Sequence, residues 1–182
     1  MLEVGVVPGL HKNESGLTWL ESRSHFGAWA VTSNPLILGL DVRNDTTMDL
    51  MWPIIANAEV LAVNSAWAGA SGTRVLAAEA NVTWTPCGFW PTCSARAWEV
   101  WSKPLPGGGA AVVVLNHQPS ANATVTVPWG ALPGLAAACT SGGAFCAVRD
   151  LWAHANVGSF QEGFTISELA PHDSAFFTVQ HA

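Results

Sequence analysis

The sequence predicts an α/β portion followed by an all-β domain, with the change between them near residue 64. Before that point, helical patterns alternate with short apolar runs, as in α/β proteins. Between residues 65 and 73 the chain is rich in glycine and other small residues, and beyond residue 74 short β-forming runs alternate with turn sequences. We therefore assign residues 1–64 to an α/β portion, 65–73 to a linker and 74–182 to an antiparallel β-sandwich.

The clearest helical pattern covers residues 17–31. Thr18 and Glu21 have the spacing of a capping box, which satisfies backbone N–H groups at a helix N-terminus. One face of the helix collects most of its apolar side chains, namely Leu17, Leu20, Phe26, Trp29 and Ala30. Pro35 ends this helix. The next run, Leu36–Leu40, is apolar at every position and therefore predicts a parallel strand that is buried on both faces.

A second helix is expected from Thr46, which has Asp49 three residues later, to about Asn57, with an interruption at Pro53. Glu59–Asn64 is another apolar run and continues the α/β alternation. A segment of about 65 residues with one or two strands cannot cover both faces of a parallel sheet. The first portion is therefore expected to be the tail of a larger α/β domain, and less stable alone than the sandwich.

Seven β-rich runs follow the linker, separated by turn sequences such as Pro106–Gly109. Short strands with turns between them predict an antiparallel sandwich or barrel. The runs are Arg74–Ala80, Ala95–Lys103, Ala110–Asn116, Thr124–Pro128, Cys146–Asp150, Ser159–Ile166 and Ser174–Val179. Strand alternation puts Trp98 and Trp101 on opposite faces, and we favour core positions for these rings over sugar stacking.

Composition excludes several classes of partner. The chain is 49% hydrophobic and 11% charged, with a mean hydropathy of +0.28. A helix that crosses a membrane needs about 18 consecutive apolar residues, and no apolar run in this sequence approaches that length, so no membrane partner is expected. The net charge is −6 and the seven Lys and Arg residues are scattered, so no nucleic-acid partner is expected. The apolar composition fits either a very well-buried protein or a piece whose core partner lies elsewhere.

Cysteines and sequons indicate an oxidising compartment. Two short-range pairs, Cys87 with Cys93 and Cys139 with Cys146, are candidate disulfides, although four cysteines allow three connectivities. Neither spacing is that of a zinc site, so no metal is expected. N-glycosylation sequons begin at Asn13, Asn44, Asn81 and Asn122. A secreted or lysosomal/vacuolar location follows. Because the first residues lack a signal-peptide pattern, we expect that the natural N-terminus has been lost.

Several stretches resemble glycoside hydrolase family 27, which contains α-galactosidases and α-N-acetylgalactosaminidases. Residues 1–5, 24–44 and 52–64 are similar to the closing segment of its catalytic barrel. Residues 97–116, 148–160 and 170–179 are similar to its C-terminal sandwich. The resemblance implies the last βα units of a (β/α)₈ barrel followed by an antiparallel β-sandwich.

The same resemblance implies a retaining hydrolase acting on terminal α-linked galactose, without cofactor or metal. Its two aspartates, a nucleophile and an acid/base, would both precede Met1, so this chain holds no catalytic residue and is expected to be inactive alone. Its partners would be α-galactoside sugars in the full-length enzyme, and either the missing barrel segment or a second copy of the chain. The alternatives are an α-N-acetylgalactosaminidase, or a non-catalytic secreted module that binds glycan or packs on another protein.

Few site residues can be carried over. Met1 matches a methionine that helps to wall the sugar pocket, or else is an initiator without that role. Asp41 ends the run Leu36–Leu40, at the strand end where barrel active sites lie, but the resemblance gives it no catalytic part. We expect Asp41 and Arg43 to form a structural ion pair at the barrel rim. The chain departs from the family at Asn64–Gly69, which keeps only the first and last residues of the usual motif.

Overall fold

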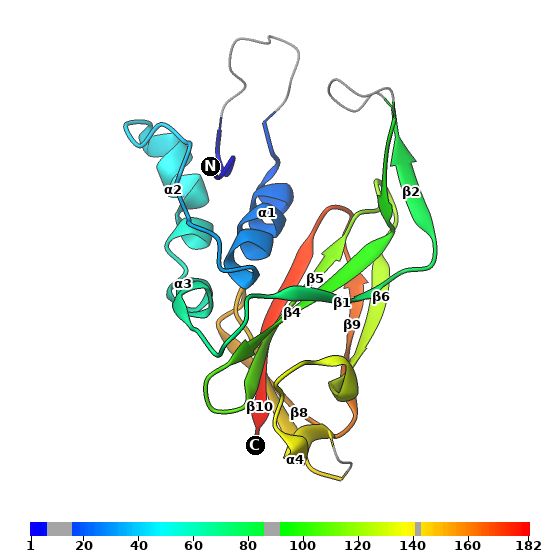
Figure 1. Cartoon of the computed structure of the whole chain (residues 1–182). Coiled ribbons are helices and arrows are strands. Elements are labelled where there is room, and N and C mark those ends of the chain that lie inside the picture. Colours follow the sequence, from blue (N-terminus) through cyan, green and yellow to red (C-terminus); the bar gives the residue numbers. More distant parts are fainter. Residues whose placement is uncertain (7–15, 86–91, 141–142) are drawn as a thin grey trace.

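The computed structural model describes residues 1–6, 16–85, 92–140 and 143–182, and it has three layers (Figure 1). Three helices lie on one face of a six-stranded sheet, and a two-stranded sheet covers the other face. The helices are α1 (Trp19–Val31), α2 (Asp45–Ile55) and α3 (Ala58–Ser65). The described parts thus contain the predicted antiparallel sandwich, with a helical layer packed on its larger sheet.

The six-stranded sheet is antiparallel throughout, in the order β1-β4-β5-β10-β7-β8. Its strands are β1 (Thr73–Ala77), β4 (Trp98–Leu105), β5 (Gly109–Asn116), β7 (Cys146–Asp150), β8 (Ala155–Phe160) and β10 (Ser174–His181). The opposite layer pairs β6 (Ala123–Pro128) with β9 (Gly163–Leu169), beside the short helices η1 (Trp129–Ala131) and α4 (Ala137–Thr140). A separate hairpin pairs β2 (Asn81–Trp84) with β3 (Cys93–Arg96).

Both faces of the central strand β5 are covered, which explains why all eight of its residues are buried. Val112 and Val114 point into the core beneath β6 and β9, whereas Val113 and Leu115 point toward the helices. Strand β4 has the same alternation. Trp98 packs on the first of these cores and Trp101 on the second, which confirms the predicted opposite faces and agrees with a packing role.

The helix predicted at residues 17–31 is confirmed as α1. Its capping box is formed, because Thr18 Oγ1 accepts from the N–H of Glu21 at 3.3 Å and a Glu21 carboxylate oxygen accepts from the N–H of Thr18 at 2.7 Å. The second helix starts earlier than predicted. Asn44, not Thr46, is the N-cap of α2 and accepts from the N–H of Thr47 at 3.0 Å, and Pro53 lies within the helix.

Two assignments in the first portion are wrong. Glu59–Asn64, read as a continuation of the strand–helix alternation, belongs to helix α3, whose N-cap Asn57 accepts from two backbone N–H groups at 3.1 Å. Leu36–Leu40 is not a buried strand but contributes one isolated parallel bridge, between Leu38 and Leu2. The side chains of Ile37 and Leu38 are 61% and 37% exposed, and only Leu40 is buried. A strand that is buried on both faces needs neighbours on each side, and the described residues do not supply them for this run.

The predicted strands are otherwise close to those observed, with three exceptions. The run Ser159–Ile166 spans the end of β8, a bend and the start of β9, the run Ala95–Lys103 spans the end of β3 and most of β4, and β2 was not predicted. The disulfide Cys139–Cys146 is confirmed, with the Cα atoms 5.7 Å apart. Cys87 lies outside the described residues, so its pairing with Cys93 stays a prediction.

The helical layer and the sheet share one apolar core. Phe26 of α1 is 1% exposed and belongs to the same buried cluster as Val113 and Phe176 of the sheet. Gly27 lets helix α1 approach the sheet closely, because a Cβ at this position would lie 3.3 Å from the ring of Trp152 and 3.5 Å from that of Phe176. Gly72, at the end of the linker, donates its N–H to the carbonyl of Val31 at 3.0 Å. These contacts fix α1 against β5 and β10 (Figure 1).

Candidate functional site

A pair of parallel segments lies at the edge of the helical layer. The N–H of Leu2 donates to the carbonyl of Ile37 at 2.8 Å, and the N–H of Gly39 donates to the carbonyl of Leu2 at 3.1 Å. Helix α1 connects the two segments, so together they form one β-α-β unit. Their carboxyl ends, at Val4 and Leu40, therefore lie at the same edge, which is where active sites lie in barrels built from such units.

Asp41 and Arg43 follow the second segment and form the expected ion pair. The guanidinium donates to the two carboxylate oxygens at 3.0 and 3.1 Å, and the N–H of Arg43 adds a third bond at 3.0 Å. Hydrogen bonding from the Arg43 side chain, and next from its backbone, lowers the pKa of Asp41. An exposed carboxylate held ionised in this way is a poor proton donor, which agrees with a structural part for Asp41.

Met1 lies beside the second segment. Its side chain is 74% exposed, and its Cε would lie 3.4 Å from a Cβ placed on Gly39. Gly39 needs to be glycine here, because the same Cβ would stand 2.7 Å from the carbonyl oxygen of Leu2. The two segments therefore approach closely with Met1 at their open side, and its role in a sugar pocket stays a prediction.

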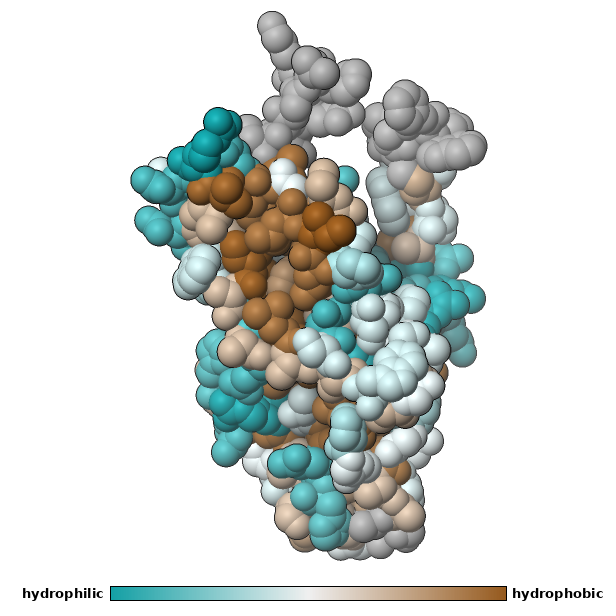
Figure 2. All heavy atoms as spheres, turned by 60° about the vertical axis from the view of Figure 1, so that its left-hand side comes forward, coloured by the Kyte–Doolittle hydropathy of each residue, from teal (hydrophilic) through white to brown (hydrophobic). Residues whose placement is uncertain are grey.

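The outer side of this pair is apolar and unpaired. Among the described residues, neither the N–H nor the C=O of Leu38 has a hydrogen-bond partner. Exposed apolar side chains continue from this edge over α2, and Figure 2 shows hydrophobic atoms gathered on the helical side of the molecule. We call this set the apolar edge: Met1, Ile37, Leu38, Val42, Leu50 and Trp52, which are between 37% and 74% exposed. A free strand edge flanked by apolar side chains favours the addition of another strand.

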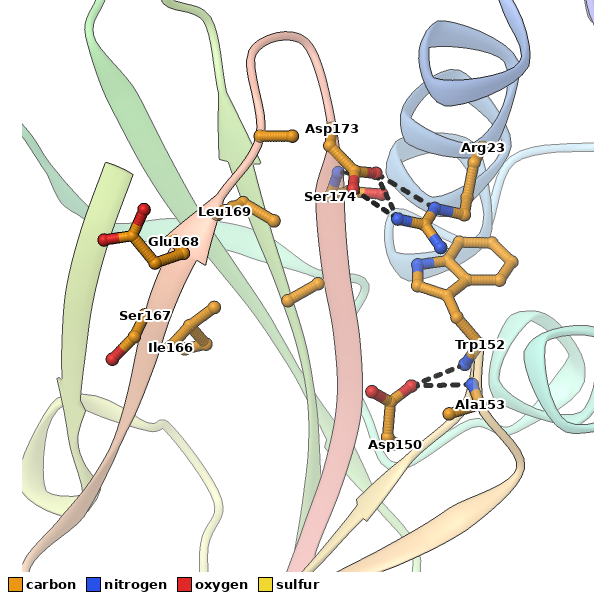
Figure 3. A pocket seen from close by; sticks show the side chains of 12 residues that line it. Arg23, Asp150, Trp152, Ala153, Ile166, Ser167, Glu168, Leu169, Asp173 and Ser174 are labelled. Atoms are coloured by element: carbon orange, nitrogen blue, oxygen red, sulfur yellow. Dashed lines mark hydrogen bonds and ion pairs between the residues drawn. The ribbon is translucent and has the colours of Figure 1, made fainter. Parts of the chain in front are cut away.

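Three ties made by charged side chains join the helical layer to the sandwich, and the first is between Arg23 of α1 and Asp173 (Figure 3). The Nε of Arg23 donates to an Asp173 oxygen at 3.0 Å, and its Nη2 contacts both carboxylate oxygens. The guanidinium carbon lies 4.9 Å from the ring centre of Trp19 and 5.7 Å from that of Trp152. Asp173 is only 8% exposed, so this pair is screened less than a surface pair.

The second tie joins Glu59 of α3 to the β7–β8 turn. Arg149 donates to the two oxygens of Glu59 at 2.5 and 2.8 Å, and His154 Nδ1 lies 2.8 Å from one of them. The hydrogen bonds from Arg149 are the main cause that lowers the pKa of Glu59 to about 2. The Glu59 carboxylate therefore stays ionised, and its ion pair with Arg149 stays formed, until the pH falls to about 2.

The third tie is a buried lysine. Lys103 of β4 is 0% exposed, and its Nζ donates to the carbonyls of Val63 at 2.6 Å and Asn64 at 3.1 Å, at the C-terminal end of α3. A cation at this end of a helix also opposes the helix dipole. Burial lowers the pKa of Lys103.

Sequence reasoning missed all three ties, because each joins residues far apart in the chain. A signal did exist, since Lys103, Arg149 and Asp173 all lie in the stretches that carry the family resemblance. A charged residue inside an otherwise apolar strand, as at Lys103, was the strongest single indication of a buried partner.

The other predicted residues lie at the surface. The sequon residues Asn44, Asn81 and Asn122 are exposed, while Asn13 lies outside the described residues. Their glycosylation stays a prediction. Within the described ranges no group of three or more His, Cys, Asp or Glu side chains could hold a metal ion. Within those ranges, too, no helix is long and apolar enough to cross a membrane.

Comparison with known proteins identifies the family. Residues 95–179 match the family described as the alpha galactosidase C-terminal beta sandwich domain. The chain is 34% identical over 179 residues to an alpha-galactosidase of Oryza sativa, covering 98% of this chain and 34% of the rice protein. It is 33% identical over 187 residues to alpha-galactosidase 3 of Arabidopsis thaliana, covering all of this chain and 36% of that protein.

Solved structures agree with this. The crystal structure of alpha-galactosidase I from Mortierella vinacea superposes with a TM-score of 0.70 at 26% identity, covering 95% of this chain and 38% of that one. The present chain thus spans about a third of the length of the relatives that it matches. The similarity covers the helical layer as well as the sandwich, because nearly all of the chain is matched. Residues 95–179 therefore belong to the family of α-galactosidase C-terminal β-sandwich domains, and the whole chain is similar to about a third of an α-galactosidase.

Proposed function

We propose that this chain is the C-terminal part of a retaining hydrolase that releases terminal α-linked galactose. In this proposal the two catalytic carboxylates come from polypeptide other than residues 1–182. The observation that carries it is the apolar edge, which borders a parallel β-α-β unit whose Leu38 backbone has no hydrogen-bond partner among the described residues. The chain also spans only about a third of the length of its relatives. The rest of a barrel would cover this edge and bring its strand ends beside Val4 and Leu40.

The chain's own part in the reaction would be structural. One aspartate of the complete enzyme attacks the anomeric carbon while the other protonates the leaving oxygen and then activates water. Such displacement requires the strand ends to be held in place to within fractions of an ångström. Residues 1–5 and 37–41 would close the barrel, and the three ties to the sandwich would hold α1 and α3, and with them these two segments, in position.

Reconstitution tests the proposal. We would refold the chain with the part of the rice alpha-galactosidase that precedes the matched region, and measure hydrolysis of p-nitrophenyl α-D-galactopyranoside. We expect no activity from either piece alone and activity from the mixture. The variant Leu38→Lys places a charge on the apolar edge and should abolish the recovery. The matched control is Val157→Lys on the sandwich strand β8, where the native side chain is 44% exposed, and it should leave recovery intact.

The outcomes separate the alternatives. Stable association without hydrolysis would favour the non-catalytic module, and hydrolysis by the chain alone would contradict the absence of catalytic groups. Parallel assays with p-nitrophenyl N-acetyl-α-D-galactosaminide decide between the two sugars. In this proposal the complete protein is secreted or lysosomal/vacuolar, which the Cys139–Cys146 disulfide supports. Loss of mass on treatment with an N-glycanase, after expression in a secreting eukaryotic host, would test that location.

A further inference from the structure

A surface hollow of about 380 Å³ lies where the β2–β3 hairpin joins the six-stranded sheet, beside β1 and β4 (Figure 1). The hairpin continues the pair β1–β4, because the carbonyls of Ala80 and Trp98 each accept a backbone N–H across the junction at 2.9 Å. The lining residues come from both pairs of strands, and we call this set the hairpin hollow: Arg74, Asn81, Ser94, Ala95, Arg96 and Glu99. The backbone bonds therefore hold the two halves of the hairpin hollow in a fixed arrangement.

Asn81, at the start of β2, lines the hairpin hollow and is also the acceptor residue of the sequon at residues 81–83. It is exposed and lies directly opposite Arg96 in the hairpin, where facing side chains are close neighbours. Its side-chain amide has no hydrogen-bond partner among the described residues, in contrast to that of Asn122, whose nitrogen donates to Glu168 at 2.7 Å. Asn81 therefore presents an accessible amide nitrogen at the edge of the hollow.

Hydrogen-bonding groups that the protein leaves open to solvent border Asn81. Arg96 uses one guanidinium N–H for a backbone carbonyl at 2.8 Å, and its other guanidinium N–H groups have no partner within the described part of the chain. Arg74, by contrast, is paired with Glu99 at 2.6 Å. The hydroxyl of Ser94 is exposed and makes no hydrogen bond to any described residue. A sugar attached to Asn81 would therefore find donors from Arg96 and a hydroxyl from Ser94 next to its own polar groups.

We propose that Asn81 carries an N-glycan whose first sugar lies in the hairpin hollow and accepts from the Arg96 guanidinium. The donor is a lipid-diphosphate-linked oligosaccharide: Nδ2 of Asn81 bonds to the anomeric carbon, the bond from that carbon to the diphosphate breaks, and one amide proton is released. The sugar also covers β1, an edge strand of the six-stranded sheet, and so shields backbone groups that favour pairing with another chain. The inference rests on the proposed secreted or lysosomal/vacuolar location, because this transfer takes place in the secretory pathway.

Two variants of the full chain, secreted from a eukaryotic host, provide the test. The first retains only the Asn81 sequon, and the second retains only the Asn44 sequon, on the exposed start of α2. The other sequons lose their hydroxyl residue, through Ser15→Ala and Thr124→Ala in both variants, Thr46→Ala in the first and Thr83→Ala in the second. The mass of each protein reports whether a glycan is attached. The rate at which an N-glycanase cleaves the bond between asparagine and the first sugar reports whether that sugar is held.

We expect a glycan on Asn81 that the folded protein releases about tenfold more slowly than the glycan on Asn44, the factor that one hydrogen bond of ordinary strength provides. After denaturation the two glycans should be released at the same rate, because the hollow is then lost.

A further pair of variants separates the hollow from a general effect of folding. Arg96→Gln in the first variant removes the guanidinium and should raise the rate of release to that of Asn44. The matched control Arg43→Gln changes an exposed guanidinium on the helical layer and should leave the release slow. The inference is overturned if only Asn44 carries a glycan, if the folded protein releases both glycans equally fast, or if the slow release survives Arg96→Gln or denaturation. A lack of glycan at both positions would overturn the proposed location, and this inference with it.

Discussion

The replacement of Phe26 by alanine tests whether the helical layer and the sheet unfold together. Phe26 is 1% exposed and belongs to a cluster that spans α1 and the strands β5 and β10. Truncating a buried phenylalanine costs about 3–5 kcal/mol, because it removes transfer free energy and leaves a cavity. A domain of this size has a total stability of about 5–15 kcal/mol. The single change should therefore remove a large share of the free energy of unfolding.

Urea denaturation followed by far-ultraviolet circular dichroism and by tryptophan fluorescence measures this. For an m-value of about 2 kcal/mol/M, the midpoint should fall by about 2 M, and by the same amount with both probes. The control is Leu50→Ala on the exposed face of α2, where the side chain is 55% exposed and the expected change is within about 0.5 kcal/mol. Two separate transitions, of which Phe26→Ala moves only one, would refute a common core.

Three further predictions concern the ties and the linker. Because the folded-state pKa of Glu59, about 2, lies below its ordinary value of 4.5, its stabilisation is present above pH 4.5 and is lost as the pH falls toward 2. The difference in melting temperature between the wild type and Glu59→Gln should therefore be largest near neutral pH and vanish near pH 2; a constant difference would contradict this. Lys103→Met removes the hydrogen-bond donor from the buried carbonyl of Val63 and the partly buried carbonyl of Asn64, and should cost about 1–3 kcal/mol in urea denaturation; an unchanged midpoint would show that the lysine is dispensable. Gly72→Ala places a Cβ 2.4 Å from the Val31 carbonyl oxygen and should cost about 1–3 kcal/mol, whereas Gly130→Ala, with no atom within 4 Å, should cost less than half of that.

Local signals in the sequence predicted what depends on neighbouring residues. The capping box of Thr18 and Glu21 located the start of α1, and the turn sequences separated most of the strands. The disulfide Cys139–Cys146 follows from a short loop. The family resemblance agreed with the order of the two portions, which the sequence patterns had already predicted.

The failures have physical causes. A short apolar run has no periodicity that separates a strand from a buried helix, so Glu59–Asn64 could not be assigned to a helix from its apolar residues. The signal that was overlooked is Asn57, which caps helix α3. The expected weakness of residues 1–64 was argued from a parallel sheet, including the run Leu36–Leu40, that so short a portion cannot cover. The structure instead buries several side chains of this portion with the sheet, including Leu2, Phe26, Met51, Ile54 and Val60. Such packing, and an ion pair between residues 150 positions apart such as Arg23 and Asp173, cannot be inferred from local patterns.

The three ties also restrict how this domain can be exchanged between homologous proteins. Each tie joins a residue before position 66 to one after position 72, so a recombination point within residues 66–72 takes one half of every tie from each parent. A parent that lacks the acidic partner of Arg23 would leave a largely buried guanidinium unpaired, which costs more than the lost bond itself. Chimeras of these proteins should therefore fold well only when Arg23 with Asp173, and Glu59 with Arg149, are inherited or replaced as pairs.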